Sequence, residues 1–439
     1  MLGWSPSEAN LAAPRPPQFT LNVDLDESTS AASFRLGVSV AGTAGVSGSV
    51  SSHPALGGLG AVDVPWCMSV LSPSLTVNGV PFVNAVVASD EPQQVFLAAE
   101  VGPQMLAGLV GSAAIEGRGV TATIVMSTAN ALGAPDIHIP VAIKRVLLNT
   151  STISAISSEI NAVLTMALAR DPQRDGSLAA LLHPRQTATV LANRGTLAHS
   201  SIVGYYGIFY HEGCVNYALE KRDKALSSIG RPLRDEHEVR MVVKEVLDGL
   251  SFLHGPTVRL VHNDLKPANI LANFCQTADG TVATIAKKSI RLCDFGCAVA
   301  LPPDSDHILC APDALDLGTL MYKPPERLCA KPGANGYLRY SDKADIWSLG
   351  ITAFELLTGK LLFATTELVG SSRSMHLATQ FGMGQSHIHS LIHDVAQHHP
   401  VPVSIEFLGF LCKCLTLDDG LRPSAASLLH HPFLKSSDW

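Results

Sequence analysis

The first quarter of this 439-residue chain contains very few basic residues. Residues 1–107 carry two arginines, no lysine and eight acidic residues, a net charge of −6 out of −7 for the whole chain. Proteins that bind nucleic acid through their surface carry a basic patch or tail. The sequence has no such patch, so we expect no nucleic acid among its partners.

Paired cysteines and long apolar runs are also missing. The nine cysteines include no C-x-x-C pair, so their spacing indicates neither a disulfide framework nor a zinc finger. The absence of such cysteine patterns favours a reducing compartment, so we expect a cytoplasmic protein, with the nucleus as the alternative. The apolar stretches are interrupted well before the roughly eighteen residues that a membrane-spanning helix needs, and no basic region precedes an apolar core at the N-terminus. We therefore expect no membrane insertion.

Composition divides the chain near residue 107. Residues 1–60 are rich in Ala, Ser, Gly and Pro, a composition that buries too little apolar surface to offset the cost of ordering the backbone. We therefore predict an N-terminal extension over 1–107 that is partly disordered. Within it, Asn78-Gly79 lies between β-rich runs and predicts a β-hairpin near 70–90. A longer linker is the alternative.

A polar loop at residues 262–269 carries the clearest chemistry. It reads His262-Asn-Asp264-Leu-Lys266-Pro-Ala-Asn269 and lies between two short apolar runs. In one rigid loop, a carboxylate can accept a hydroxyl proton, a lysine can stabilise a phosphoryl oxygen and an asparagine can hold a metal ion. The loop resembles the catalytic loop H-R-D-x-K-x-x-N of eukaryotic protein kinases, with Asn263 in place of Arg. A generic polar turn is the alternative reading.

Two upstream stretches resemble the nucleotide-binding elements of the same family. Residues 115–124 contain Gly117 and Gly119 and match the phosphate-covering loop G-x-G-x-x-G-x-V, with Ala122 for the third Gly and Ile124 for Val. Glycines let a hairpin tip approach phosphate oxygens closely. The sequence also allows an alignment that places this glycine-rich loop around Gly111. The next stretch, Val141-Ala142-Ile-Lys144, implies a lysine that pairs with phosphates, and Ala142 beside the nucleotide.

The kinase lysine needs a carboxylate on the next helix to orient it. Between Lys144 and His199 the acidic residues are Glu159, Asp171 and Asp175. Glu159 alone lies in a stretch with the i, i+3, i+4 apolar spacing of an amphipathic helix, so it is the predicted partner.

The stretch Ile202-Val-Gly-Tyr-Tyr-Gly-Ile-Phe is similar in sequence to the corresponding stretch of the mitogen-activated protein kinase kinases. By that resemblance Leu219 lines the adenine site and Glu220 begins the hinge between two lobes, although a slip of one residue stays open. An apolar stripe from Asp235 to His254 predicts a long helix with acidic residues in its first turn.

Further motifs follow the catalytic loop. Asp294-Phe-Gly resembles the metal-binding D-F-G segment. Residues 297–323 then correspond to the activation segment, which ends in a G-T-x-x-Y-x-P-P-E pattern. Thr319 together with Lys266 is the serine/threonine pattern. The resemblance further implies that Asp345 supports the backbone of the catalytic loop and that Arg422 forms a buried ion pair with Glu326.

The predicted fold is α+β, a two-lobed kinase domain over 108–435. Its β-rich N-lobe, with one main helix, covers about 108–220, and its mostly helical C-lobe about 221–435, with insertions near 170–197, 272–290 and 362–400. The resemblance implies a serine/threonine protein kinase that uses ATP and Mg²⁺. We expect a protein Ser/Thr hydroxyl as the substrate, and regulatory proteins that bind through 1–107 or the insertions. The alternative is a pseudokinase, a nucleotide-binding scaffold.

The implied roles in phosphoryl transfer are divided among few residues. Lys144, oriented by Glu159, holds the α/β-phosphates, and the glycine-rich loop covers them. Asp294 and Asn269 hold Mg²⁺. Asp264 accepts the substrate proton, and Lys266 stabilises the γ-phosphate.

Asn263 changes what is expected of regulation. In kinases with Arg at that position, a phosphate on the activation segment pairs with the guanidinium and orders the segment. Asn263 has no charge to offer, so we predict activity that does not depend on this pairing. Negative charge in the segment is then supplied by four aspartates, Asp304, Asp306, Asp313 and Asp316, and Ser305 is a candidate phosphosite. The segment lacks the S/T-x-x-x-S/T spacing of mitogen-activated protein kinase kinases.

Overall fold

The computed structural model describes most of the second half of the chain and parts of the first. The described residues are 18–26, 31–39, 46–47, 76–77, 80–81, 93–94, 114–118, 122–131, 134–147, 152–168, 199–211, 214–230, 232–233, 235–276, 283–310, 317–329, 336–363, 371–399 and 402–435. The predicted insertion at 170–197, together with Gly119, Asp313 and Asp316, lies outside them.

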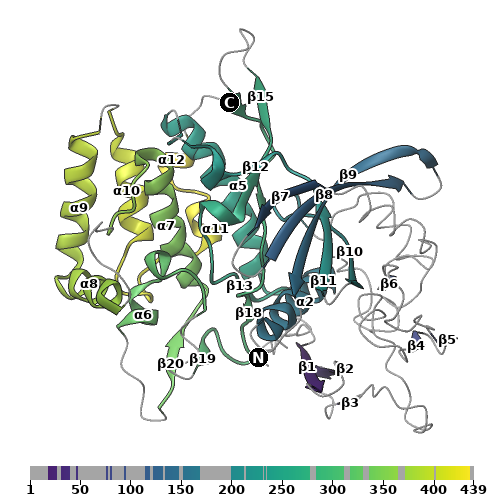
Figure 1. The fold of residues 1–439 in the computed structure, drawn as a ribbon. Coiled ribbons are helices and arrows are strands. Elements are labelled where there is room, and N and C mark those ends of the chain that lie inside the picture. The colour runs from purple at the N-terminus through teal and green to yellow at the C-terminus, as the bar shows by residue number, and fades with distance from the viewer. Residues whose placement is uncertain are drawn as a thin grey trace, which may run out of the picture.

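A six-stranded antiparallel sheet forms the smaller lobe (Figure 1). Its spatial order is β6 (Gln93–Gln94), β10 (Tyr205–His211), β11 (Cys214–Glu220), β9 (Ala134–Leu147), β8 (Ala122–Ala131) and β7 (Ala114–Arg118). The helix α2 (Ile153–Leu168) packs on this sheet through Ile156, Ile160 and Val163, all of which are buried. The spacing of these three residues is the amphipathic pattern that predicts the helix.

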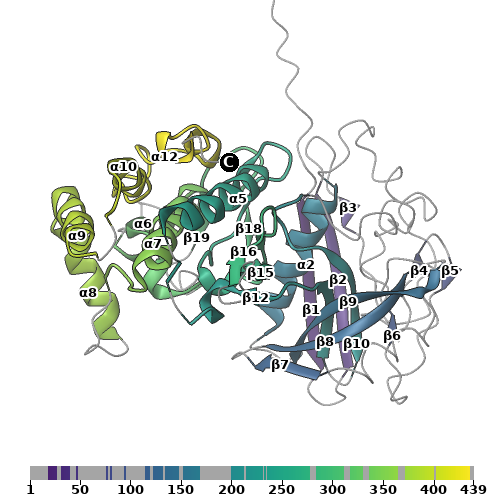
Figure 2. The same cartoon turned by 90° about the horizontal axis from the view of Figure 1, so that it is seen from above.

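The larger lobe is mainly helical and lies beside the sheet (Figure 2). Its helices are α5 (Glu236–His254), α6 (Pro325–Leu328), α7 (Lys343–Thr358), α8 (Ser371–Gly382), α9 (Gln385–Gln397), α10 (Ile405–Cys414), α11 (Ala425–Leu428) and α12 (Pro432–Lys435). In α5, the side chain of Asp235 caps the N-terminus by accepting from Glu238 N at 3.0 Å. The predicted stripe from Val239 to Leu250 is its buried face.

Short antiparallel pairs connect these helices. They are β12 (Lys224–Ala225) with β14 (Ile270–Ala272), β14 with β17 (Arg291–Leu292), β13 (Leu260–Val261) with β18 (Val299–Ala300), β15 (Phe274–Gln276) with β16 (Ala283–Ile285), and β19 (Ile308–Cys310) with β20 (Leu338–Tyr340). Among the described residues, short 3-10 turns also lie at Leu226–Ser228, Pro267–Asn269 and Leu320–Tyr322. The catalytic loop lies between β13 and β14.

Within the predicted insertion at 362–400, the described residues form a pair of helices, α8 and α9, that belongs to the core. Phe381 on α8 contacts the rings of Trp347 and Phe363, and Ile388 and Ile392 on α9 are fully buried. In the part of the chain that the structure describes, no helix combines the length and apolarity needed to cross a bilayer.

Residues 18–47 contain a β-ribbon that the composition of this region does not predict. β1 (Gln18–Asp26) pairs with β2 (Ala31–Ser39), which pairs with β3 (Val46–Ser47). The signal is a period-two alternation, which an average over sixty residues conceals: Phe19, Leu21, Val23 and Leu25 are in register with Val38, Leu36, Phe34 and Ala32. Further along, β4 (Thr76–Val77) pairs with β5 (Val80–Pro81) on either side of Asn78-Gly79.

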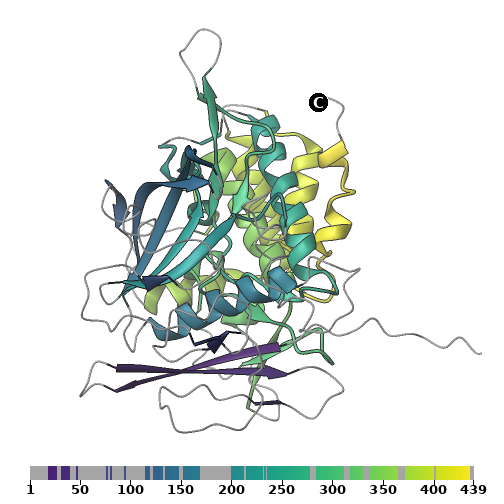
Figure 3. The ribbon, with the colours of Figure 1, turned by 90° about the vertical axis from the view of Figure 1, so that its right-hand side faces the viewer.

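The β-ribbon, here residues 18–47, lies along α2 (Figure 3). β1 is the strand that contacts this helix. Ala162 and Thr165 of α2, which face away from Ile156 around the helix, are buried as well. The helix is therefore covered on both the sheet side and the outer side.

Candidate active site

Three charged side chains from separate elements meet between the two lobes. Lys144 on β9 has its Nζ at 2.7 Å from Glu159 Oε2 on α2 and at 2.7 Å from Asp294 Oδ1 in the loop after β17. Tyr205 donates to the other oxygen of Glu159 at 3.0 Å. The ion pair predicted for Lys144 and Glu159 is therefore present, and it forms across the sheet–helix contact that α2 makes.

Burial and charge act in opposite directions on Lys144. Burial, the largest single effect, disfavours the ammonium form, but the Coulomb attraction of Glu159 and Asp294 together with their hydrogen bonds outweighs it and raises the pKa of Lys144. Asp294 is only partly buried, and the cost of this partial burial is outweighed by the charge and hydrogen bond of Lys144, so the net result is a lowered pKa of Asp294. Lys144 is thus a cation and Asp294 an anion at neutral pH, which suits a site that binds phosphates and a metal ion.

The second group of side chains surrounds Asp264. Oδ1 of Asp264 accepts from Thr319 N at 2.8 Å and from Thr319 Oγ1 at 2.7 Å, while Oδ2 accepts from Lys266 Nζ at 2.8 Å and Asn269 Nδ2 at 3.0 Å. Lys266 also donates to Thr319 Oγ1 at 2.6 Å. A lysine, an amide and a hydroxyl are therefore all held within hydrogen-bond distance of the Asp264 carboxylate.

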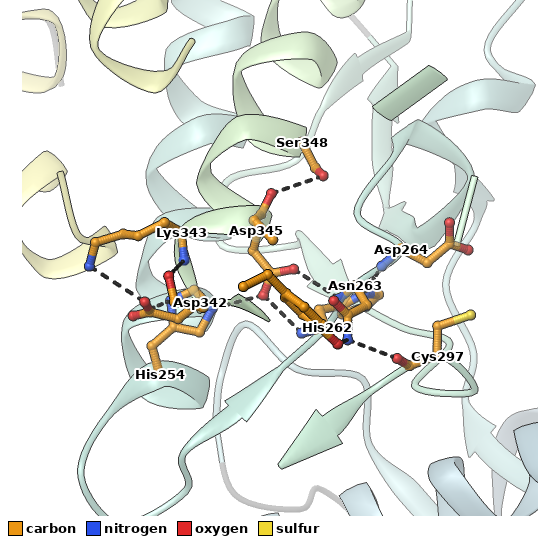
Figure 4. A network of polar contacts seen from close by, with 12 residues as sticks. His254, His262, Asn263, Asp264, Cys297, Asp342, Lys343, Asp345 and Ser348 are labelled. Carbon is orange, nitrogen blue, oxygen red and sulfur yellow. Dashed lines mark hydrogen bonds and ion pairs between the residues drawn. The ribbon is translucent and has the colours of Figure 1, made fainter. Parts of the chain in front are cut away.

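The backbone of this loop is held by Asp345 of α7 (Figure 4). Its carboxylate accepts from the backbone N of His262 at 2.8 Å and of Asn263 at 2.9 Å, and it pairs with His254 Nε2 at 2.8 Å. Asp345 is completely buried, and the pKa of its carboxyl is lowered because these bonds outweigh the cost of burial. The support of the loop by Asp345, implied by the sequence, is formed.

Left-handed backbone occurs at two positions of the site. Asn263 has φ +65 and Asp294 has φ +65. Asn and Asp tolerate this conformation better than most residues do.

Phe295, next to Asp294, is fully buried and its ring lies 5.0 Å from that of His262. Desolvation raises the pKa of the neighbouring Cys293 thiol, so this residue stays protonated and behaves as a small hydrophobe.

The remaining predicted nucleotide-binding residues lie on the sheet. Gly117 is opposite Ile124 in the β7–β8 pair, and Ala122, at the start of β8, is in register with Val146 of β9. Ala142 is opposite Leu219 in the β9–β11 pair, and both are buried.

Glu220 connects the lobes. Its Oε2 accepts from Arg291 Nε at 3.3 Å and from Gly204 N at 3.2 Å, and its Oε1 accepts from Arg222. The chain then passes directly to β12, which pairs with β14 of the larger lobe. The side chain of Glu220 is therefore used in structural contacts.

The comparisons with known proteins agree with this geometry. A model of the protein kinase domain matches residues 185–434, more than half of the chain. The chain belongs to the protein kinase family. The two-lobed α+β architecture follows from that membership. The match begins after Lys144 and Glu159, so the position of these two kinase residues in the site rests on their geometry.

The relatives of this kinase include members of mitogen-activated protein kinase cascades. It is 30% identical over 244 residues to mitogen-activated protein kinase kinase 1 of Arabidopsis thaliana, covering 53% of this chain and 58% of the relative. It is 31% identical over 242 residues to mitogen-activated protein kinase kinase 5 of Leishmania mexicana, covering 55% and 39%. It is 30% identical over 304 residues to human mitogen-activated protein kinase kinase kinase 5, covering 67% and 19%. The kinase thus matches less than two thirds of each of these relatives.

The donor set fits a magnesium nucleotide. Mg²⁺ is typically bound by one or two carboxylates, with phosphate oxygens and waters completing the octahedron. Asp294 is an anion whose side chain is 44% exposed, and Asn269 lies in the same loop as Asp264. Among the described residues there is no cluster of three His, Cys, Asp or Glu that would form an all-protein metal cage. Asp294 and Asn269 would hold the ion, with phosphates supplying the other oxygens.

Sequence reasoning missed some residues that support the site. Tyr205 and His254 orient Glu159 and Asp345, and Arg327 contacts the catalytic loop. Tyr205 lies in the stretch that resembles the mitogen-activated protein kinase kinases, and Arg327 directly follows the P-P-E motif, but neither pattern specifies these contacts. The predicted pair of Arg422 with Glu326 is present and bidentate, at 2.7 and 3.0 Å.

Proposed function

We propose that this protein is an active serine/threonine protein kinase, which transfers the γ-phosphate of ATP to a Ser or Thr hydroxyl of a protein. The observation that carries the proposal is the assembled state of both groups of side chains. Lys144 contacts Glu159 and Asp294 at the same time, and Asp264 contacts Lys266, Asn269 and Thr319. A scaffold that only binds nucleotide would not require the second group.

Each group has a separate task in the proposed reaction. Lys144, held by Glu159, orients the α/β-phosphates, and Asp294 and Asn269 would hold Mg²⁺, which would neutralise charge on the phosphates. Asp264 accepts the proton of the attacking hydroxyl. Lys266 lies next to Asp264 and neutralises charge near the γ-phosphate, while Thr319 keeps the Asp264 carboxylate in place. Most of the catalytic effect then comes from positioning and electrostatics.

The test is phosphate transfer from ATP·Mg to a generic basic protein carrying Ser and Thr. The wild-type chain is expected to transfer phosphate well above the rates of its Lys144→Met and Asp294→Asn variants. Equal transfer by all three proteins would reject the enzyme and favour the pseudokinase alternative.

We further propose that activity does not require phosphorylation of the activation segment. The beginning of the segment is already held: Arg259 donates to the carbonyls of Pro302 at 3.1 Å and Ser305 at 2.9 Å, and pairs with Asp306 at 3.2 Å. The Ser305 hydroxyl donates to His307 O at 3.0 Å and accepts from His307 N. All of these contacts are made between groups of the chain itself.

The Ser305→Ala variant is therefore expected to keep transfer within about twofold of the wild type, as for most surface substitutions. The substitution removes the two hydrogen bonds between the Ser305 hydroxyl and the His307 backbone, and it removes no charge. The measurement is the initial rate of both proteins, before and after phosphatase treatment. A folded Ser305→Ala protein with almost no activity would contradict the proposal, and so would loss of wild-type activity on dephosphorylation.

The β-ribbon of residues 18–47 is proposed to support the active arrangement. β1 contacts α2, the helix that carries Glu159, in a structure in which Glu159 is paired with Lys144. An element that binds the assembled state more tightly than the unpaired state shifts the population toward the assembled state. Regulatory proteins that bind residues 1–107 would then act through α2.

Removing residues 1–47 is expected to lower transfer about tenfold, because α2 loses its outer cover and the paired state is less populated. This cut leaves β6, which pairs with β10 of the sheet, in place. The matched point variants are Leu21→Asp, at a position of the apolar register, and Asn22→Asp, its neighbour on the opposite face. Only the first is expected to reproduce the loss in a kinase assay. A truncated protein with higher activity would show that the β-ribbon restrains α2.

A further inference from the structure

Asn263 lies in a buried polar cluster between the catalytic loop and the activation segment. Its Nδ2 donates to Cys297 O at 3.2 Å and to the Tyr340 hydroxyl at 3.2 Å. Its Oδ1 accepts from Arg327 Nη1 at 3.3 Å, and its backbone carbonyl lies 3.4 Å from the same nitrogen. Both ends of the Asn263 amide are therefore used inside the protein.

Arg327 brings a cation into this cluster from the short helix α6. Its side chain is 2% exposed, and its guanidinium lies 5.0 Å from the centre of the Tyr340 ring. Nη2 donates to Leu317 O at 2.7 Å. One guanidinium thus contacts the catalytic loop through Nη1 and the activation segment through Nη2. The planar fork of arginine can make both contacts at once, which a lysine ammonium cannot do with the same geometry.

The contact with Leu317 lies directly before the residues that bind Asp264. Gly318 follows with φ +83 and passes so close to the catalytic loop that a Cβ there would lie 2.3 Å from Asn263 O. Thr319 then donates twice to Asp264. A shift of Leu317 away from Arg327 would move Thr319 relative to Asp264, because a single residue separates them.

The helix that carries Arg327 is itself fixed. Its neighbour Glu326 forms the bidentate pair with Arg422, whose side chain is fully buried. The guanidinium of Arg422 also lies 5.2 Å from the centre of the Trp347 ring in α7. The backbone of α6 is therefore held in place, and a residue can position other groups only if its own backbone is fixed.

We propose that Arg327 is a positioning residue for phosphate transfer. It holds the end of the activation segment against the catalytic loop and thereby places Thr319 on Asp264. The inference rests on the proposed kinase function. It assigns to a cation on α6 the ordering that an arginine in the catalytic loop performs in other kinases with the help of a phosphate.

The same geometry explains why an asparagine suits position 263. The Arg327 guanidinium needs an acceptor there, and an arginine side chain has five donors and no acceptor. A second guanidinium at 263 would also bring two like charges together in a buried place, which is costly. Asn263 offers an amide oxygen to Arg327 and an amide NH₂ to Cys297 O, and its type tolerates the left-handed backbone.

The experiment compares Arg327→Met with the wild type. We expect kcat for a protein substrate to fall about a hundredfold, as when catalytic groups are misplaced by about 1 Å. The KM for ATP should change little, because Arg327 contacts neither Lys144 nor Asp294. Hydrogen exchange in a peptide spanning residues 317–319 should become faster, because the Thr319 amide loses its fixed acceptor.

Arg240 of α5 provides a matched control. It donates to Phe433 O at 2.7 Å and lies 5.1 Å from the centre of the Phe433 ring, so it resembles Arg327 in chemistry but lies outside the site. Arg240→Met is expected to lower thermal stability without changing kcat or exchange at 317–319. If Arg327→Met kept kcat within about threefold of the wild type, or matched Arg240→Met in every readout, the proposal would be overturned.

Two further points keep the test decisive. If Arg327→Met does not fold, Arg327→Lys replaces it: the charge stays, one of the two contacts is lost, and faster exchange at Thr319 with a smaller fall in kcat is expected. Unchanged hydrogen exchange at residues 317–319 in Arg327→Lys would show that the two simultaneous contacts of the Arg327 guanidinium are not needed. If the wild-type chain transfers no phosphate, the proposed function fails, while the exchange measurement still decides whether Arg327 positions Thr319.

Discussion

The Asp294→Asn substitution is expected to lower phosphate transfer at least about a hundredfold, the usual effect of removing one charged group from a preorganised site. Asp294 is one of the two carboxylates that hold Lys144, at 2.7 Å, and its lowered pKa keeps it an anion at neutral pH. An amide of the same size keeps the shape of the side chain but loses the charge that Mg²⁺ needs. The measurement is the initial rate of transfer from ATP·Mg to a basic protein substrate.

The control for this substitution is Asp394→Asn, an exposed position on α9 away from the site. It is expected to leave the rate unchanged. Lys144→Met serves as the companion variant, because it removes the cation while Glu159 and Asp294 remain. If the Asp294→Asn protein kept more than about a tenth of the wild-type rate, the electrostatic role given to Asp294 would be wrong.

The Gly318→Ala substitution is expected to reduce transfer about a hundredfold, because it displaces catalytic groups. A Cβ on Gly318 would lie 2.3 Å from Asn263 O, and the φ of +83 is unfavourable for alanine in addition. The segment must therefore move away from the catalytic loop, and Thr319 moves with it. The measurements are kcat and the hydrogen exchange of residues 317–319.

Gly384→Ala is the control that separates the steric clash with Asn263 O from the cost of the left-handed backbone. Gly384 lies between α8 and α9 with φ +89, and a Cβ there would meet nothing within 4 Å. Gly384→Ala carries only the left-handed penalty of about 1–3 kcal/mol, so it should lower the melting temperature and leave kcat unchanged. Equal effects of the two variants on kcat would show that the close approach of Gly318 to Asn263 does not matter for activity.

Several parts of the site were readable from the sequence because they depend on short segments. The loop from His262 to Asn269 holds its carboxylate, lysine and amide within eight residues, and their contacts follow from that closeness. The helix from 236 to 254 follows from an apolar stripe and a capping aspartate. Glu159 was found by elimination, since few acidic residues lie between Lys144 and His199.

The β-ribbon could not be predicted from composition, because an average over sixty residues conceals the apolar alternation of its strands. The composition of residues 1–60 indicated little order, whereas the alternation from Phe19 to Leu25 and from Phe34 to Val38 specifies a two-stranded ribbon. The same pattern does not say that β1 packs against α2, more than a hundred residues away in the sequence. That contact depends on how the chain returns to the smaller lobe.

The residue types of the loop at 262–269 and the uncharged side chain at position 263 can be read from the sequence. The cation that contacts Asn263 is found only in the folded chain. Arg327 contacts Asn263, which is 64 positions away, and Leu317, which is ten positions away. Local patterns encode backbone conformation and the types of side chain in a loop. Contacts between distant segments depend instead on packing, here on the Glu326–Arg422 pair that fixes α6 beside the catalytic loop.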